Sequence, residues 1–261
     1  MRSTKYTSAR FPVSDDEIRS QSEEYCIIEQ DGKERKIRFH DYHEIYAIPG
    51  LYEHIFYDRL KCRSPEVITR LLIDQINRSS RSTSELTVCD MGAGNGIVGE
   101  ILKQNGVDVI VGIDVVPEAA VAVRRDRPGV YNAYYVEDLG HLSPDTRKEL
   151  EAKGLNCLVT SGALGFGDIP ASAFAEGYNL IATDGWIAFN IKEDFIEDND
   201  STGFSSLLSR MLERGILELR TRHRYCHRLS VDGRKLYYVA MVGLKRGPIP
   251  QALIKTEGNG T

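Results

Sequence analysis

This sequence lacks the features that would assign it to a membrane, a metal centre or nucleic acid. No apolar run approaches the roughly 20 residues that span a bilayer, and no apolar signal core follows Met1. The 33 basic and 38 acidic residues give a net charge of −5, so no global positive field attracts nucleic acid. The five cysteines form no CxxC pair, which argues against a zinc cluster and a disulfide framework. We therefore expect a cytoplasmic protein with no metal, no membrane partner and no nucleic-acid partner.

Strand-like and helical patterns alternate from residue 86 onward. Five predicted strands are each followed by a helix, and two longer strands close the chain as a hairpin (86–89, 109–113, 133–136, 155–160 and 186–191, then 216–229 and 235–244). Such alternation is typical of a parallel sheet with helices on both faces. The predicted fold class is α/β: a Rossmann-like doubly wound sheet, mostly parallel, with a C-terminal antiparallel hairpin.

The first 64 residues follow a different pattern, which predicts an N-terminal α/β extension that caps the core. Residues 26–39 are expected to form a hairpin that turns at Asp31-Gly32, and residues 40–60 are rich in aromatic side chains and histidine. Ser64 is expected to be the N-cap of the next helix. The predicted organisation has three parts: a cap (1–64), a cofactor-binding domain (65–246) and a flexible tail (247–261).

Residues 88–96, Val-Cys-Asp-Met-Gly-Ala-Gly-Asn-Gly, predict a buried strand, a glycine loop and the start of a helix. Residues 94–99 also match GxGxxG, and Asp114 follows about twenty residues later, which is the pattern of NAD(P)-dependent oxidoreductases. Asp90, however, stands directly before the glycines, where its carboxylate would repel a pyrophosphate. Gly92 has no role in the dinucleotide pattern. These two residues favour a ligand with a cationic amino acid end.

The ordered set of motifs resembles class I S-adenosyl-L-methionine (SAM)-dependent methyltransferases over roughly residues 65–245. The resemblance is carried by residues 88–96, by Ile113-Asp114 and by three later segments (136–139, 158–161 and 183–186). Residues 159–189 also resemble a subgroup that includes the Williams–Beuren-region methyltransferase-like proteins. The resemblance implies SAM as the methyl donor and S-adenosyl-L-homocysteine (SAH) as the product.

The resemblance also implies a role for each residue of the motifs. The glycine loop would pass close to the methionine part of the cofactor, Asp90 would hold its amino group through water, and Asp114 would bind both ribose hydroxyls. Asp138 and the backbone of Leu139 would hold the adenine, Val115 would pack on its face, and Ser161 would line the methyl end. The expected cofactor-binding residues are Asp90, Gly92, Ala93, Gly94, Gly96, Asp114, Val115, Asp138, Leu139 and Ser161. The alternatives are a helix-capping role for Asp114, a loop role for Asp90, and Glu137 in place of Asp138.

The methyl acceptor is expected to be a small molecule, because no motif for a nucleic-acid base amine follows Ser161. His43 and His54 are candidate general bases, and Tyr57 is a candidate for folding over the donor or the acceptor. Packed or surface side chains are the alternative for all three. Residues 192–204 form an acidic segment that is either a lid or a solvated loop.

The leading hypothesis is therefore a SAM-dependent methyltransferase that acts on a small molecule. A non-catalytic methyltransferase-like binding module is the first alternative. It would use four arginines, predicted to share one strand face, to bind a partner (Arg220, Arg222, Arg224 and Arg228). An NAD(P)-dependent oxidoreductase is the second alternative. The sequence leaves open the acceptor atom (O, N, C or S), the use of a general base and the oligomeric state.

Overall fold

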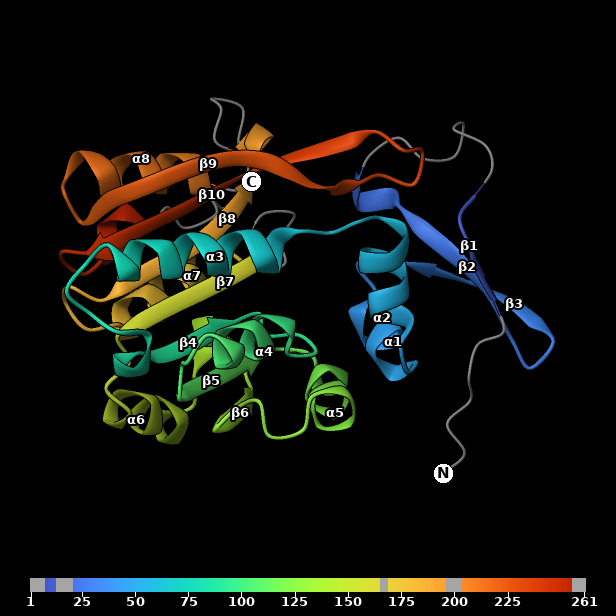
Figure 1. The fold of residues 1–261 in the computed structure, drawn as a ribbon, viewed down its shortest axis with the longest axis horizontal. Helices are drawn as coiled ribbons and strands as arrows, with labels where there is room; N and C mark the ends of the chain where they lie inside the picture. Colours follow the sequence, from blue (N-terminus) through green and yellow to red (C-terminus); the bar gives the residue numbers. More distant parts are fainter. Residues whose placement is uncertain (1–7, 13–20, 165–168, 196–202, 255–261) are drawn as a thin grey trace, which may run out of the picture.

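A seven-stranded sheet forms the centre of the protein, and a separate three-stranded sheet lies at its N-terminal end (Figure 1). The structure is a computed structural model that describes residues 8–12, 21–164, 169–195 and 203–254. The larger sheet has the order β6-β5-β4-β7-β8-β10-β9 and the smaller one the order β1-β2-β3. The strands of the larger sheet are β4 (Thr87–Met91), β5 (Val109–Asp114), β6 (Ala133–Val136), β7 (Cys157–Leu164), β8 (Trp186–Lys192), β9 (Leu217–Leu229) and β10 (Lys235–Lys245).

The strand directions confirm the predicted fold class. β4 to β8 are parallel, and β10 lies antiparallel between β8 and β9. The usual dinucleotide-binding sheet continues its parallel order to the sixth strand. Here the closing hairpin places its second strand next to β8 instead. The sheet therefore differs from the one that the NAD(P) hypothesis requires.

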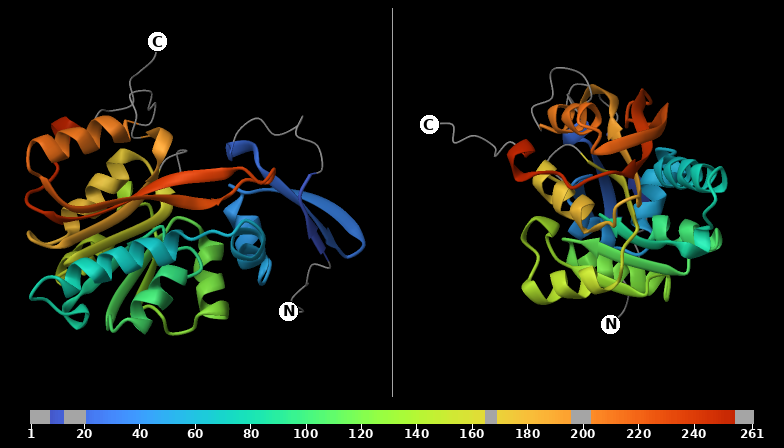
Figure 2. Two further views of the ribbon diagram at one scale, coloured as in Figure 1. Left: turned by 45° about the horizontal axis from the view of Figure 1, so that its top comes forward. Right: turned by 90° about the vertical axis from the view of Figure 1, so that its left-hand side faces the viewer.

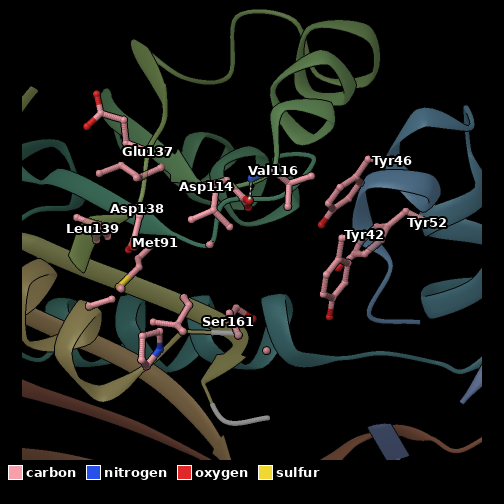
Figure 3. Close-up of a pocket in the computed structure, with 18 residues that line it drawn as sticks. Tyr42, Tyr46, Tyr52, Met91, Asp114, Val116, Glu137, Asp138, Leu139 and Ser161 are labelled. Carbon is pink, nitrogen blue, oxygen red and sulfur yellow. Dashed lines mark hydrogen bonds between the residues drawn. The ribbon is translucent and has the colours of Figure 1, made fainter. Parts of the chain in front are cut away.

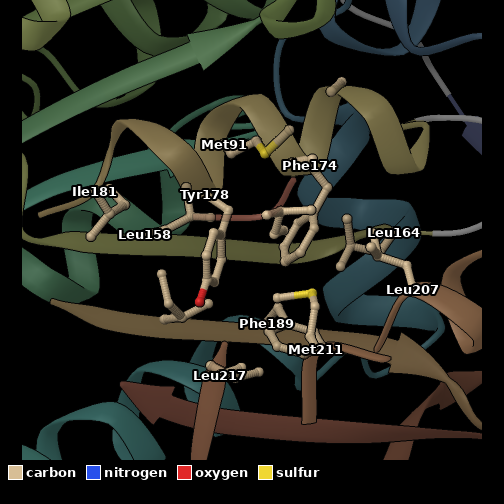
Figure 4. Close-up of a cluster of buried hydrophobic side chains, with 14 of the residues drawn as sticks. Met91, Leu158, Leu164, Phe174, Tyr178, Ile181, Phe189, Leu207, Met211 and Leu217 are labelled. Atoms are coloured by element: carbon tan, nitrogen blue, oxygen red, sulfur yellow. The ribbon is translucent and has the colours of Figure 1, made fainter. Parts of the chain in front are cut away.

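Helices cover both faces of the sheet because its strands alternate their buried side chains between the two faces. On one face, Met91, Leu158 and Phe189 pack with Phe174 and Tyr178 (Figure 4). On the other face, strand residues such as Val88 and Val159 pack against helices α3 and α4. The helices are α3 (Ser64–Asn77), α4 (Ile97–Gln104), α5 (Pro117–Asp126), α6 (Pro144–Ala152), α7 (Ala171–Leu180) and α8 (Phe204–Glu213), with short turns η4 (Thr83–Glu85), η5 (Leu139–His141), η6 (Glu193–Phe195) and η7 (Gln251–Leu253).

The N-terminal extension has a hydrophobic core of its own, which includes Ile28, Ile37, Phe39 and Ile55. The predicted hairpin is present, and Asp31 and Gly32 at its turn have φ values of 52° and 72°, as a tight hairpin turn requires. The extension consists of β1 (Ser8–Arg10), η2 (Gln21–Glu23), β2 (Tyr25–Gln30), β3 (Lys33–Arg38), α1 (Tyr42–Ala47), α2 (Leu51–Glu53) and the π-helix η3 (His54–Arg59).

The long β9–β10 hairpin joins the extension to the core (Figure 2). Near its tip, Arg228 Nη2 donates to Glu24 Oε2 at 2.5 Å, and both side chains are buried. Glu24 Oε1 also accepts the backbone N–H of Val231. Two backbone hydrogen bonds, Arg63 N–H to His227 O and Leu229 N–H to Leu60 O, continue the contact. The extension is therefore attached to the strand pair that completes the central sheet.

Three local expectations are wrong. Ser64 is the first residue of α3 rather than its N-cap, and its hydroxyl contacts Tyr225 and His227 instead of the helix backbone. Residues 247–254 are not loosely held, because Ile249 and Leu253 are buried in the main core. Arg228 does not share a face with the other arginines of β9, since a bulge between Cys226 and Arg228 changes the alternation.

Two further expectations lie partly outside the described residues. Most of the acidic segment 192–204 belongs to the range 196–202, and the end of the predicted tail is 255–261. Within the described part of the chain, no helix combines the length and apolar character that a membrane crossing requires.

Candidate functional site

The glycine loop after β4 makes two sharp changes of direction that only glycine allows at low cost. Gly92 and Gly94 have φ values of 71° and 52°. The N–H groups of Gly92 and Ala93 both donate to the carbonyl of Ile113, at 2.9 and 3.1 Å, which holds the loop against the end of β5. Gly96 then begins α4 as its N-cap. The predicted succession of strand, glycine loop and helix is present.

A cleft with about 800 Å³ of empty space, open to solvent, lies beyond the carboxyl ends of β4, β5, β6 and β7. We call it cavity A. Ligands of open α/β sheets bind at this edge, where the strand order reverses. Of the predicted cofactor residues, Gly92, Asp114, Val115, Asp138, Leu139 and Ser161 line it. Figure 3 shows Asp138 and Leu139 on one side, three tyrosines of the extension on the other, and Asp114 between them.

Asp114, at the end of β5, contacts the backbone of two loops. Its Oδ2 accepts the Gly94 N–H at 2.8 Å, and its Oδ1 accepts the Val116 N–H at 2.9 Å. The N-cap of α5 is Val116, without a side-chain cap, so Asp114 does not cap the helix that the sequence offers as its alternative role. The adjacent Val115 is 58% exposed and faces cavity A, as an apolar surface that a flat ligand can cover.

Glu137 and Asp138, which follow β6, have separate partners. Glu137 accepts hydrogen bonds from the Ser143 backbone, the Ser143 hydroxyl and Thr146, and these bonds lower the pKa of its carboxyl. Asp138 accepts from the Gly140 N–H at 2.7 Å and lies 2.8 Å from His141 Nδ1, which holds its pKa below the usual value. Both residues line cavity A. Both carboxylates thus have partners, Glu137 at the start of α6 and Asp138 within its own turn, so these contacts do not choose between the two residues.

Ser161 and Gly162 line the cavity at the end of β7. The Ser161 hydroxyl is buried and makes no hydrogen bond with any described residue. A Cβ at the neighbouring Gly92 would lie 3.0 Å from Ala163 Cβ and 3.2 Å from Ile169 Cδ1, so the bare glycine keeps this wall open. A buried hydroxyl without a partner and a glycine-lined wall fit a ligand that carries polar groups. A nucleoside joined to an amino acid, as in SAM, satisfies these requirements.

Asp90 lies under the glycine loop and lines neither cavity described here. Its Oδ2 accepts the Tyr131 hydroxyl at 2.6 Å, while its Oδ1 has no partner among the described residues. Burial is the main cause that raises the pKa of this carboxyl to about 7. The structure therefore places Asp90 in the buried part of β4 beside Tyr131, outside the lining of both cavities.

A second cavity, which we call cavity B, adjoins cavity A and extends under the N-terminal extension. Tyr42, Tyr46, Tyr52, Gly92, Ser161 and Gly162 line both cavities. Tyr46 lies directly over the loop, since a Cβ at Gly94 would be 2.5 Å from its hydroxyl oxygen. The extension therefore closes one side of the space beyond the glycine loop.

The three candidate catalytic residues have different positions. Tyr57 lines cavity B, and burial raises the pKa of its hydroxyl well above the usual value. His43 is exposed on α1, and His54 Nδ1 lies 3.6 Å from Asp58 on the same helix. Neither histidine lines cavity A or cavity B. Their side chains face away because the helix turns place Tyr42, Tyr46 and Tyr52 toward the core.

Two imidazoles line cavity B, those of His40 and His227, and sequence reasoning named neither as a candidate site residue. His227 is the one that lies far from the aromatic segment in the sequence. The sequence shows it only as a histidine between Cys226 and Arg228 in a basic strand. Its position depends on the bulge at that point of β9, for which the sequence contains no turn residue. Among the described residues, no group of three or more His, Cys, Asp or Glu side chains is arranged to hold a metal ion.

Comparison with known proteins gives a likeness in fold. The sequence matches no protein-family model and no curated protein sequence. The N-methyltransferase NodS of Bradyrhizobium japonicum, in complex with SAH, is similar with a TM-score of 0.53 at 13% identity, covering 79% of this chain and 97% of NodS. A SAM-dependent methyltransferase of Anabaena variabilis has a TM-score of 0.49 at 13% identity, covering 80% and 96% of the two chains.

Magnesium protoporphyrin IX methyltransferase of Synechocystis, with bound SAH, has a TM-score of 0.48 at 10% identity, covering 69% and 82%. The match to NodS shows that the chain has the Rossmann-like fold of class I SAM-dependent methyltransferases. The Williams–Beuren subgroup is not shown by these matches.

Proposed function

We propose that the protein is a SAM-dependent methyltransferase that acts on a small molecule. The observation that carries the proposal is the convergence of Asp114, Val115, Asp138, Leu139 and Ser161 on one cleft at the carboxyl edge of a methyltransferase-like sheet. These residues come from three different strand ends, and each is of the type that the corresponding part of SAM requires. Residues 65–246 would form the cofactor-binding domain and residues 1–64 its cap.

In this proposal the residues hold the cofactor through hydrogen bonds and apolar packing. The Asp114 carboxylate, which lines cavity A, accepts the ribose hydroxyls, Asp138 and Leu139 hold the adenine, and Val115 covers its face. Ala93 and the glycines of the loop leave space for the methionine part, and Asp90, at the end of β4, would act on the amino group through water. Bound SAM supplies an electrophilic methyl carbon. The chain supplies the alignment of that carbon with the acceptor, which is a major source of acceleration in such displacements.

Calorimetry with SAM and with SAH tests the proposal directly. Binding of both ligands is expected, and binding of neither at millimolar concentration would contradict the proposal. Turnover with a panel of small acceptors separates an enzyme from the non-catalytic alternative, which predicts SAM binding without turnover. NAD(H) binding in place of SAM would favour the oxidoreductase.

The Asp114→Asn variant is expected to bind SAM about 100-fold more weakly, because each lost hydrogen bond to a charged acceptor contributes about 1.5–3 kcal/mol. The new amide would also face a backbone N–H of Gly94 or Val116 and could not accept it. Asp108→Asn is the matched control, because Asp108 is exposed and precedes the same strand at its other end. Calorimetry of the two variants measures the difference, and equal affinities would exclude the ribose role.

The Val115→Ser variant is expected to weaken SAM binding about tenfold, because the valine surface that the adenine would cover becomes polar. Val121→Ser is the control: Val121 is 52% exposed against 58% for Val115, but it lies on α5 and lines neither cavity. The thermal unfolding midpoints of both variants should remain close to that of the wild type. If the two substitutions weaken SAM equally, Val115 has no contact with the adenine.

A further inference from the structure

A buried polar cluster lies beside cavity B and has no role in the proposed function so far. Ser64 Oγ lies 2.6 Å from the Tyr225 hydroxyl and 2.5 Å from His227 Nδ1. The amide nitrogen of Asn190 donates to both hydroxyl oxygens, at 2.9 Å to Ser64 and 2.6 Å to Tyr225. These four side chains come from the start of α3, from β8 and from β9. The cluster therefore connects elements that are far apart in the sequence.

The orientation of the Asn190 side-chain amide in this cluster follows from its contact with the backbone. Asn190 Oδ1 accepts the Gly162 N–H at 2.7 Å, and since a backbone N–H can only donate, the amide nitrogen must face Ser64 and Tyr225. Both hydroxyl oxygens thus accept one hydrogen bond from Asn190. Each hydroxyl still has a single proton to place.

One order of donation gives every proton an acceptor. If Tyr225 donates to Ser64, Ser64 donates to His227 Nδ1 and the chain is complete. The opposite order leaves the Tyr225 proton without an acceptor among the described residues, although Tyr225 is only 6% exposed. A buried donor without a partner costs about 1–3 kcal/mol. The favoured arrangement makes Nδ1 of His227 an acceptor, so its hydrogen is on Nε2.

His227 presents this Nε2–H next to the junction of the two cavities. Its ring packs on Tyr238 with centroids 4.0 Å apart, and a Cβ at Gly162 would lie 3.9 Å from Cε1. No described residue is hydrogen-bonded to Nε2. Burial and the nearby Arg228 hold the pKa of His227 well below its usual value, so the ring is a neutral donor at physiological pH. A neutral imidazole N–H polarises or holds an oxygen without contributing charge.

The remaining walls of cavity B restrict the kind of molecule that this donor can meet. Phe39, Phe56 and Tyr57 provide an aromatic surface, and the charge of Arg228 is balanced by Glu24. An ionised group would lose its hydration here without gaining an unpaired counter-charge from Arg228. Gln21, Ser64 and Asn95 add polar groups to the same lining. An uncharged molecule that combines a flat aromatic face with polar groups fits these walls best.

We propose that cavity B receives the methyl acceptor, and that the Nε2–H of His227 holds a carbonyl or hydroxyl oxygen on an uncharged acceptor with a flat aromatic face. The inference rests on the proposed function, because Gly162 and Ser161 connect cavity B to the expected methyl end of SAM. It names a specificity residue and a substrate class: small aromatic or similarly flat molecules that carry an uncharged oxygen.

Two probes of nearly equal shape test the role of the donor. Acetophenone carries a carbonyl oxygen where α-methylstyrene carries a CH₂ group. Titration of the SAH-loaded protein, followed by the NMR signals of the His227 and Tyr238 rings, should show acetophenone binding about tenfold more tightly or better. In the His227→Phe variant the ratio of the two affinities should fall to about one. His223→Phe, an exposed change on the same strand, should leave the ratio unchanged.

The ratio of the two probe affinities is informative because a general distortion of the cavity would weaken the binding of both probes by a similar factor. A ratio near one in the wild type, an unchanged ratio in His227→Phe, or binding of neither probe would overturn the inference. Nitrogen-15 NMR of the imidazole supplies a second measurement on the wild-type protein: the Nε2–H tautomer is expected, and the Nδ1–H tautomer would overturn it. Calorimetry with SAH alone measures binding in cavity A. Failure of the proposed function would therefore appear as loss of SAH binding, independently of the two acceptor probes.

Discussion

Replacing Glu24 by alanine is expected to lower the free energy of unfolding by about 3–5 kcal/mol, because it leaves the Arg228 guanidinium buried without a counter-charge. Glu24 is 1% exposed and Arg228 is 4% exposed, so water cannot replace the lost partner without disturbing the contact. The substitution also removes the acceptor of the Val231 N–H. Denaturant unfolding measures the change.

The Arg10–Glu34 ion pair supplies the control for this experiment. It lies in the same N-terminal sheet at 2.8 Å, but its side chains are 50% and 62% exposed. Glu34→Ala should cost less than about 1 kcal/mol, since exposed ion pairs contribute little. Similar losses for Glu24→Ala and Glu34→Ala would show that the buried pair does not join the two parts of the protein.

A double replacement distinguishes loss of the pair from loss of packing. Glu24→Leu combined with Arg228→Met removes both charges and keeps most of the buried volume, so it should recover much of the stability lost in Glu24→Ala. Because Arg228 lines cavity B, the same double variant should change the binding of an acceptor more than the binding of SAM. The pair therefore affects both the attachment of the extension and the shape of the proposed acceptor cavity.

The fold and much of cavity A could be predicted because the signals are local. Alternating strand and helix patterns predict the sheet, and Asp114 and Asp138 follow their strands directly in the chain. In a parallel sheet, residues at successive strand ends come to the same edge, so their convergence needs no knowledge of distant contacts. Val115 is predictable for the same reason.

The aromatic wall of cavity B lies in the segment 40–60 that the sequence singled out, whereas the wall formed by Ser64, His227 and Arg228 could not be predicted because it is built from distant pairings. Glu24 and Arg228 are 204 residues apart, and Ser64 and His227 are 163 residues apart. A register change in β9 determines which face of the sheet His227 and Arg228 occupy. A shift of a strand by one residue moves its side chains to the opposite face. The sequence pattern favoured His43 and His54, which are near the aromatic segment in the chain but face away from the cavities.

Asp90 shows the limit of arguing from charge alone. The sequence places a carboxylate before the glycine loop, which favours a cationic ligand over a pyrophosphate. In the structure this carboxyl is 1% exposed and contacts Tyr131, and burial raises its pKa to about 7. Its charge near neutral pH is therefore incomplete, and its pull on a cationic ligand is weaker than the pull that a fully ionised carboxylate would exert.

The buried Asp90 should make the protein less stable as the pH rises from about 4 to about 7. Over this interval the folded chain holds a proton that the unfolded chain, with a pKa of 3.8, has lost. The resulting stabilisation is fully present below the unfolded pKa and is lost as the pH rises through the folded value. At about 1.4 kcal/mol per pKa unit, the full effect is about 4 kcal/mol.

The Asp90→Asn variant separates this contribution from the other titrating groups, because asparagine resembles the protonated carboxyl and still accepts the Tyr131 hydroxyl. Denaturant unfolding from pH 5 to pH 8 should show the wild type losing about 2–3 kcal/mol relative to Asp90→Asn. Asp74→Asn, an exposed change on α3, should track the wild type at every pH. A constant difference between wild type and Asp90→Asn would mean that the carboxyl is already ionised at pH 5. A permanent negative charge would then stand at the end of β4, directly before the glycine loop, and the argument from charge for a cationic ligand would hold without change.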